Sequence, residues 1–100
     1  MRQAVPLRPV PTESVSDATV TPLPVARIEG HWPYGTRAVR YRVETFITGV
    51  DTEWQNAGSY KDLEAILKGF TAGQTVKVRI VAGNDSGDAP PSPEVQVVVA

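Results

Sequence analysis

The sequence predicts an all-β fold, a sandwich or a small barrel of short antiparallel strands. Apolar and polar residues alternate along four stretches of the chain, which is the pattern of a strand with one face on a core and the other in water. Clusters of glycine, asparagine, aspartate and proline separate the stretches, and these residues are typical of turns. Because no crossover segment connects the strands, a parallel sheet is not expected.

The apolar face of each predicted strand is defined by residues two positions apart. In chain order the faces are Ala26, Ile28, Gly30 and Trp32; Val39, Tyr41, Val43 and Thr45; Val76, Val78, Ile80 and Ala82; and Val95, Val97 and Val99. The intervening residues are mostly charged or polar, so we expect each strand to bury one face and solvate the other. The last strand is apolar enough to pair with another chain at its edge, and Val97→Lys should weaken such self-association.

Residues 62–69 carry a mixed signal. Asp62 is a good helix N-cap, Gly69 is a typical stop, and Leu63, Ile66 and Leu67 would share one side of a two-turn helix. A helix this short is marginal without packing, and tertiary context often overrides local propensity. We expect the segment to be mostly extended, with a surviving helical turn as the alternative.

Length and composition place the chain among single-domain globular proteins. It has 100 residues, 41% of them hydrophobic, a net charge of −1 and no cysteine. The scattered charge argues against nucleic acid and anionic membranes, which need a concentrated basic face. The absence of cysteine excludes disulfides, thiolate metal sites and a cysteine nucleophile, and no apolar run approaches the roughly 18 residues of a membrane span. We expect a monomer without cofactor or membrane insertion.

Residues 1–14 are predicted to be a flexible, proline-rich linker. Pro6, Pro9 and Pro11 favour polyproline II, and their missing N–H donors keep them out of a sheet interior. The segment has no apolar stretch of the kind found in signal peptides. Two interpretations fit this: a cytosolic protein, or a domain, residues 15–100, of a longer protein that is exported or exposed at the cell surface. We favour the second, and expect a bacterial source since cysteine is missing.

Several short segments occur in a characteristic order: Trp32 at the end of the second strand, Tyr41–Val43 in the third, Glu53–Gln55 at the start of the fourth, Phe70–Val76 at the turn into the sixth, and Arg79–Asn84, Gly87 and Pro91–Ser92 at its exit. Taken together, they resemble a fibronectin type III domain over residues 18–99. The resemblance implies a seven-stranded immunoglobulin-like β-sandwich, with the first, second and fifth strands packed on the other four. It implies no enzyme activity. Val76 stands where this family has a corner tyrosine, Phe70 replaces a leucine and Ala72 a proline.

The candidate interaction surface is a set of polar loops that such a fold would bring together at one pole. Its candidate residues are Tyr34, Arg37, Tyr60, Asn84, Asp85 and Asp88. Tyrosine and arginine carry much of the binding energy at interfaces, although the tyrosines could equally cover the end of the sandwich. Trp54 is a candidate for stacking on a sugar ring, with packing on neighbouring strands as the alternative.

No catalytic or metal site is predicted. His31 is the only histidine, and no serine lies on the strand-to-helix elbow that a nucleophile would need. The loop Asn84–Asp88 has oxygen-bearing side chains but no bidentate glutamate, so turn formation explains it better than calcium binding. The sequence favours a non-catalytic spacer or protein–protein interaction module of a larger protein. The alternative is a carbohydrate-binding accessory module of a polysaccharide-acting enzyme.

Overall fold

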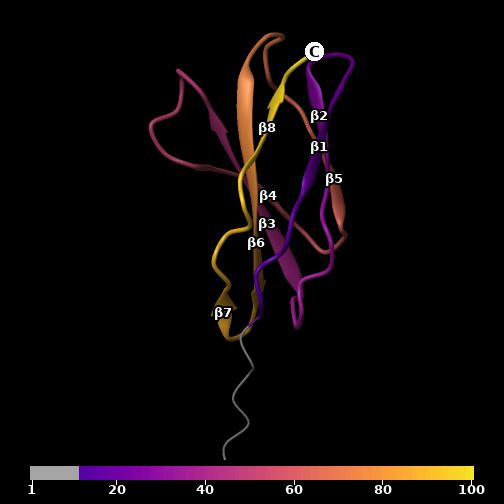
Figure 1. Ribbon diagram of the computed structural model, residues 1–100, viewed down its shortest axis with the longest axis vertical. Helices are drawn as coiled ribbons and strands as arrows, with labels where there is room; N and C mark the ends of the chain where they lie inside the picture. Colours follow the sequence, from indigo (N-terminus) through magenta and orange to yellow (C-terminus); the bar gives the residue numbers. More distant parts are fainter. Residues whose placement is uncertain (1–11) are drawn as a thin grey trace, which may run out of the picture.

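The computed structural model describes residues 12–100, which form two antiparallel β-sheets and contain no helix (Figure 1). The strands are β1 (Thr19–Leu23), β2 (Arg27–His31), β3 (Arg40–Ile47), β4 (Gln55–Tyr60), β5 (Glu64–Leu67), β6 (Thr75–Asn84), β7 (Gly87–Asp88) and β8 (Val95–Val98). One sheet has the order β1-β2-β5, and the other has the order β4-β3-β6-β7 with β8 also paired to β6. The predicted all-β sandwich, with the first, second and fifth strands on the others, is confirmed.

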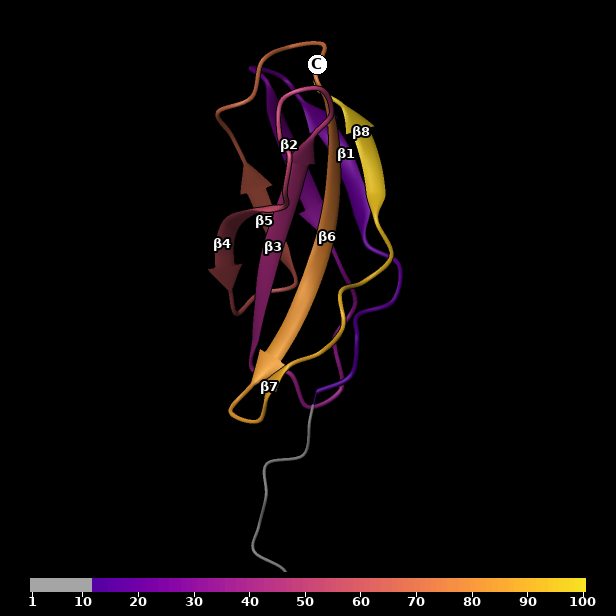
Figure 2. The same cartoon turned by 90° about the vertical axis from the view of Figure 1, so that its left-hand side faces the viewer.

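The long strand β6 shows how the alternation of residues produces the core. Val76, Val78 and Ile80 are at most 1% exposed, whereas Lys77 and Arg79 point to the outer face and are half-buried. Figure 2 shows β3 and β6 side by side along the length of the molecule, in agreement with their continuous pairing. The prediction was wrong for Val39, which is 57% exposed because β3 begins only at Arg40.

Residues 64–67 are extended, as expected, and form β5. The strand pairs with β2, placing Ile66 opposite Glu29 and Ala65 opposite Gly30. Ala65 and Leu67 are buried, whereas Leu63 and Ile66 are exposed. The helical alternative is wrong because pairing with β2 satisfies the backbone and buries alternate residues, which a two-turn helix could not do here.

The seventh strand of the predicted sandwich occurs in two pieces, β7 and β8. Prolines at 90, 91 and 93 lack the N–H groups that would continue the ladder between the pieces. The backbone N–H of Ser92 still donates to the carbonyl oxygen of Ile80, and the Ser92 Oγ accepts from the Ile80 N–H, both at 2.8 Å. In β8, Val97 is buried and Val98 is exposed, so Val97→Lys is the wrong substitution for probing this edge.

Aromatic side chains fill the core as the resemblance implied. Trp32 and Tyr41 are 5% and 2% exposed, with ring centroids 6.0 Å apart. The Tyr41 hydroxyl also accepts a hydrogen bond from the backbone N–H of Gly35 at 3.0 Å, which ties the β2–β3 loop to the core. At the turn into β6, where the corner tyrosine is missing, the Gln74 side chain accepts from the Thr71 N–H at 2.8 Å instead.

Candidate functional site

The polar loops of the candidate interaction surface leave the sandwich at the same pole. Strand pairing sets Arg40 opposite Gly83, Tyr41 opposite Tyr60 and His31 opposite Glu64. The connections 32–39, 61–63 and 85–86, which join β2 to β3, β4 to β5 and β6 to β7, therefore lie at one end of the molecule. We call this end the loop pole.

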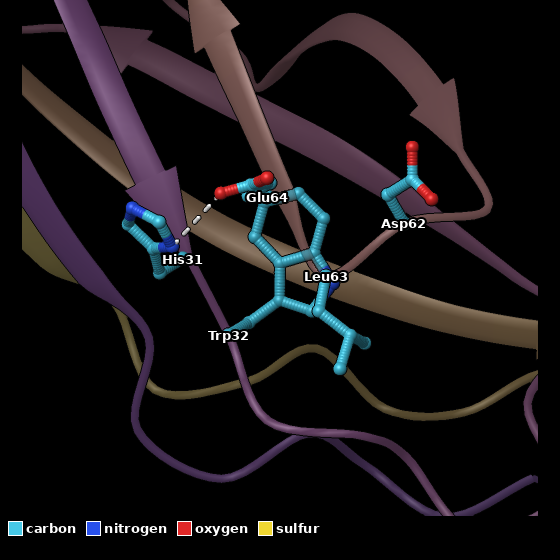
Figure 3. Close-up of a pocket in the computed structure, with 5 residues that line it drawn as sticks. All are labelled: His31, Trp32, Asp62, Leu63 and Glu64. Carbon is cyan, nitrogen blue, oxygen red and sulfur yellow. Dashed lines mark ion pairs between the residues drawn. The ribbon is translucent and has the colours of Figure 1, made fainter.

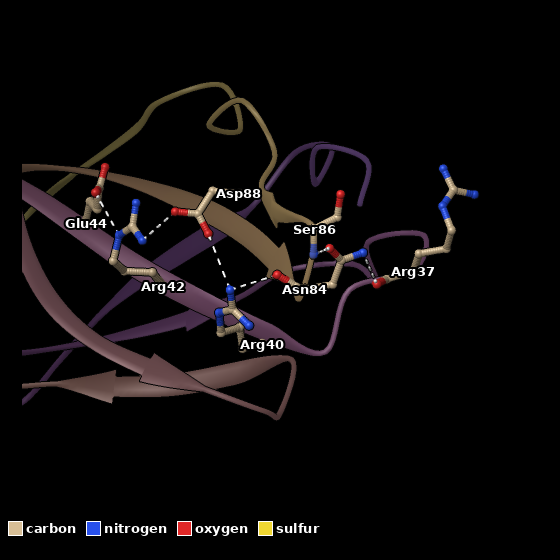
Figure 4. Close-up of polar contacts among 7 residues, drawn as sticks. All are labelled: Arg37, Arg40, Arg42, Glu44, Asn84, Ser86 and Asp88. Atoms are coloured by element: carbon tan, nitrogen blue, oxygen red, sulfur yellow. Dashed lines mark hydrogen bonds and ion pairs between the residues drawn. The ribbon is translucent and has the colours of Figure 1, made fainter. Parts of the chain in front are cut away.

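Asn84 holds the loop pole together instead of facing outward. It is 7% exposed. Its Nδ2 donates to the carbonyl oxygen of Arg37 at 3.1 Å, and its Oδ1 accepts from the N–H of Ser86 at 2.8 Å (Figure 4). The second bond is an asparagine turn of the kind expected from the loop composition. A buried side chain with these bonds stabilises the pole and offers no contact surface, so Asn84 is placed differently from the prediction.

The segment 12–14 lies against the loop pole, although the sequence placed it in the linker. The Thr12 hydroxyl and the Glu13 N–H both donate to the carbonyl oxygen of Thr36, at 2.9 and 3.0 Å. The carboxylate of Glu13 forms an ion pair with Arg37 at 3.6 Å, and the Ser14 hydroxyl donates to the carbonyl oxygen of Pro90. The predicted linker residues 1–11 lie outside the described residues.

The two tyrosines of the predicted patch have different environments. Tyr34 is 64% exposed. Tyr60 packs on Trp32, with ring centroids 6.3 Å apart, and its hydroxyl donates to the carbonyl oxygen of Ala57 at 3.3 Å. Tyr60 therefore covers the end of the core. The exposed members of the candidate set are Tyr34, Arg37, Asp85 and Asp88; of these, Arg37 is ion-paired with Glu13, and Tyr34 and Asp85 lie in the loops at the tip of the pole.

The outer face of β3 and β6 carries a chain of ion pairs. The Arg42 guanidinium donates to Asp88 at 2.9 Å and to Glu44 at 3.0 Å, and Arg79 donates to the second oxygen of Glu44 at 2.7 Å. Figure 4 shows the part of this chain that runs toward Arg40 and the loop pole. Asp88, a candidate interaction residue, is therefore held by Arg42 and, at 3.9 Å, by Arg40.

These ion pairs fix the charges of the network. Burial alone would raise the pKa of Glu44, but the hydrogen bonds from Arg79 and Arg42 outweigh it and lower that pKa. Hydrogen bonds to Asp88 and Glu44 raise the pKa of Arg42 above its ordinary value. Val81, which lies opposite Arg42 on the same face, is 4% exposed. The network thus shields apolar surface on the outer side of the sheet.

Trp54 extends the same network. The Arg79 guanidinium carbon lies 4.1 Å from the centroid of the Trp54 ring, and the Phe46 ring packs against it at 5.8 Å. Lys77 in turn lies over Phe46 at 5.7 Å. At least one face of the indole is occupied by a cation. Trp54 thus packs on side chains of the neighbouring strands, which was the alternative to sugar stacking. Sugar stacking stays a prediction.

The β1-β2-β5 sheet has a different polar cluster at the end of β2. His31 faces solvent, and its Nε2 lies 3.3 Å from a carboxylate oxygen of Glu29. Its Nδ1 lies 3.4 Å from a carboxylate oxygen of Glu64 (Figure 3). Neither glutamate was predicted as a partner of His31. The alternation of β2 could have placed Glu29 beside His31, but Glu64 is brought there only by the pairing of β5 with β2.

Two adjoining hollows flank this cluster. One, of about 320 Å³, is lined by His31, Trp32, Asp62, Leu63 and Glu64, and the other, of about 330 Å³, by Glu29, Glu64, Ala65 and Ile66. Over residues 12–100 no group of three or more histidine or acidic side chains is arranged to hold a metal ion. In the same range no helix is long and apolar enough to cross a membrane.

No family model and no curated protein matches the chain, but solved structures do. The FN1–FN3 domains of chicken CNTN1 match with a TM-score of 0.79 and 19% identity, over 89% of this chain and 32% of that one. The twitchin kinase region of C. elegans matches at 0.77 and 17%, over 88% and 16%. The FN5 domain of Drosophila Lar matches at 0.73 and 21%, over 90% and 97%.

The chain therefore has the fold of a fibronectin type III domain, as the sequence resemblance implied. It spans less than a third of the CNTN1 structure and 16% of the twitchin structure, and corresponds to a modular domain in each.

Proposed function

We propose that the chain is a non-catalytic module that spaces or presents neighbouring domains of a larger protein. The observation that supports this most directly is the position of the two ends of the domain. Residues 12–14 lie at the loop pole, bonded to Thr36 and Pro90. At the C-terminal end, the N–H of Val99 donates to the carbonyl oxygen of Gln74, and the N–H of Gly73 donates to that of Val99, both at 2.8 Å, at the opposite pole.

Both ends are fixed to the sandwich, so neighbouring domains would be attached at opposite poles with a defined separation. The polar loops lie beside the entering segment, and Glu13 already forms an ion pair with Arg37. A domain that precedes residue 12 would therefore be the nearest partner for Tyr34 and Asp85. The exported bacterial setting stays a prediction.

The experiment is a chain of two copies, with Ala100 of the first joined to Met1 of the second, studied by small-angle X-ray scattering. We expect a maximum dimension close to twice that of one copy and equal unfolding free energies for the two copies. Glu13→Gln, which weakens the ion pair to Arg37, should broaden the distance distribution without changing the unfolding free energy by more than about 0.5 kcal/mol. A compact particle with the copies side by side would contradict the spacer function.

The polysaccharide alternative has a separate test. Soluble polysaccharides are titrated into the labelled domain while the indole N–H signals of Trp32 and Trp54 are followed by NMR. Because Arg79 occupies a face of Trp54, we expect no saturable shift of its signal. A saturable shift of the Trp54 signal, accompanied by backbone amide shifts that are lost in Trp54→Ala, would assign carbohydrate binding to this face instead.

A further inference from the structure

The outer edge of β5 is free to pair with another strand. Among residues 12–100, β5 pairs only with β2. The N–H of Trp32 donates to the carbonyl oxygen of Leu63 at 3.0 Å, which makes these residues a hydrogen-bonded pair. Since such pairs alternate along antiparallel strands, the backbone groups of Glu64 and Ile66 point away from β2, toward the open edge.

The side chains along this edge are acidic and apolar. Glu64 lines both hollows, Glu29 lies across from Ile66, and Asp62 lies at the loop-pole end. Ile66 is 52% exposed and Leu63 is 40% exposed. Within the described residues, the carboxylates of Glu29 and Glu64 have only the imidazole of His31 as an ion-pair partner. A side chain that suits this lining has an apolar stem and a cationic end, as lysine and arginine have.

An unsatisfied donor lies in the wall of the same surface. The Nε1 of Trp32 is buried and has no hydrogen-bond acceptor in the described part of the chain. Trp32 lines the hollow beside Leu63, Asp62 and Glu64 (Figure 3). Buried donors usually have an acceptor, so the indole N–H of Trp32 is a group whose environment should change when a strand docks beside Leu63.

We propose that the β5 edge binds an extended peptide segment of a partner protein that carries a lysine or arginine. The segment adds a strand to the β1-β2-β5 sheet through the backbone groups of Glu64 and Ile66. Its basic side chain lies along Ile66 and reaches Glu29 and Glu64, where it replaces His31 as their partner. This surface is separate from the Tyr34 and Asp85 loops, so the proposal goes beyond the spacer function.

The test uses the full chain and a short probe, acetyl-Thr-Val-Lys-Val-Thr-amide, with a control peptide that has glutamate in place of lysine. NMR titration to about 2 mM peptide would detect binding with a dissociation constant as weak as about 1 mM. We expect saturable shifts at Glu64–Leu67 and at the Trp32 indole N–H with the lysine peptide only. Hydrogen exchange at the Glu64 and Ile66 amides should slow, because a docked strand protects them and simple charge attraction does not.

The matched variants are Glu29→Gln with Glu64→Gln, and as a control Asp17→Asn with Glu53→Gln, which removes the same charge from exposed positions elsewhere. The first pair should weaken the lysine peptide about five- to tenfold, whereas the control should leave its affinity nearly unchanged. Equal loss in both pairs, equal binding of the two peptides, or shifts confined to the loop pole would overturn the proposal. If neither peptide causes shifts, but the chain self-associates and the β5 amides are protected from hydrogen exchange, the edge pairs with a second copy of the chain instead.

Discussion

The outer faces of both sheets carry charged side chains but use them differently. On β3 and β6, Glu44 has two arginine partners, and the chain of contacts continues through Arg79 to Trp54. On β2 and β5, Glu29 and Glu64 share one histidine beside two hollows. The polar side chains of one face are thus paired with one another, whereas those of the other include carboxylates with a single imidazole partner, and it is on this second face that we propose peptide binding.

The largest expected effect distinguishes the buried Trp32, beside the β2–β5 hollow, from Trp54, which packs on the outer face of β3 and β6. Trp32→Ala removes a buried ring that contacts Tyr41 and Tyr60. It should lower the free energy of unfolding by about 3–5 kcal/mol, out of the roughly 5–15 kcal/mol typical of a domain. Trp54→Ala is the matched control and should cost about 1 kcal/mol, because that ring packs on the surface. Urea denaturation of both variants measures the difference, and a melting temperature of Trp32→Ala lowered by only a degree or two would contradict the core assignment.

A second effect compares one glutamate from each face. Glu44→Gln leaves Arg42 and Arg79, which are both half-buried, without the carboxylate that they share. We expect a loss of about 1–2 kcal/mol of unfolding free energy. Glu64→Gln, at an exposed position beside His31, should change it by less than about 0.5 kcal/mol. Similar losses at the two positions, measured by urea denaturation, would show that the faces do not differ in this way.

The network should also make stability depend on pH in a defined direction. The pKa of Glu44 is lowered in the folded state from its ordinary value near 4.5. Its contribution is therefore complete above that ordinary value and is lost as the pH falls through the lowered folded pKa. The difference in unfolding free energy between the natural chain and Glu44→Gln should shrink from pH 7 to pH 3. A difference that stays constant over this range would mean that Glu44 acts through its shape alone.

Much of the fold could be predicted because strands follow local alternation, as at Val76, Val78 and Ile80. The pairing of distant residues could not. Asn84 was expected in a binding patch, but its side chain bonds the carbonyl oxygen of Arg37, 47 positions away. Likewise, Thr12 was assigned to the linker because of the nearby prolines, whereas its hydroxyl bonds Thr36. Local composition identifies a turn or a linker, but only the packed structure decides which polar side chains are already in use.

The smallest expected effect tests whether β8 behaves as an open edge like β5. Val98 is 55% exposed, whereas Val97 and Val99 are buried, so β8 offers little apolar surface to a second copy. We expect the natural chain and Val98→Lys to sediment as monomers, with unfolding free energies within about 0.5 kcal/mol of each other. If the natural chain self-associates and Val98→Lys does not, β8 pairs two copies of the chain. An edge strand could then bind another chain without carboxylates beside it. If both self-associate, β5 becomes the edge to test, with Glu64→Lys as the next variant.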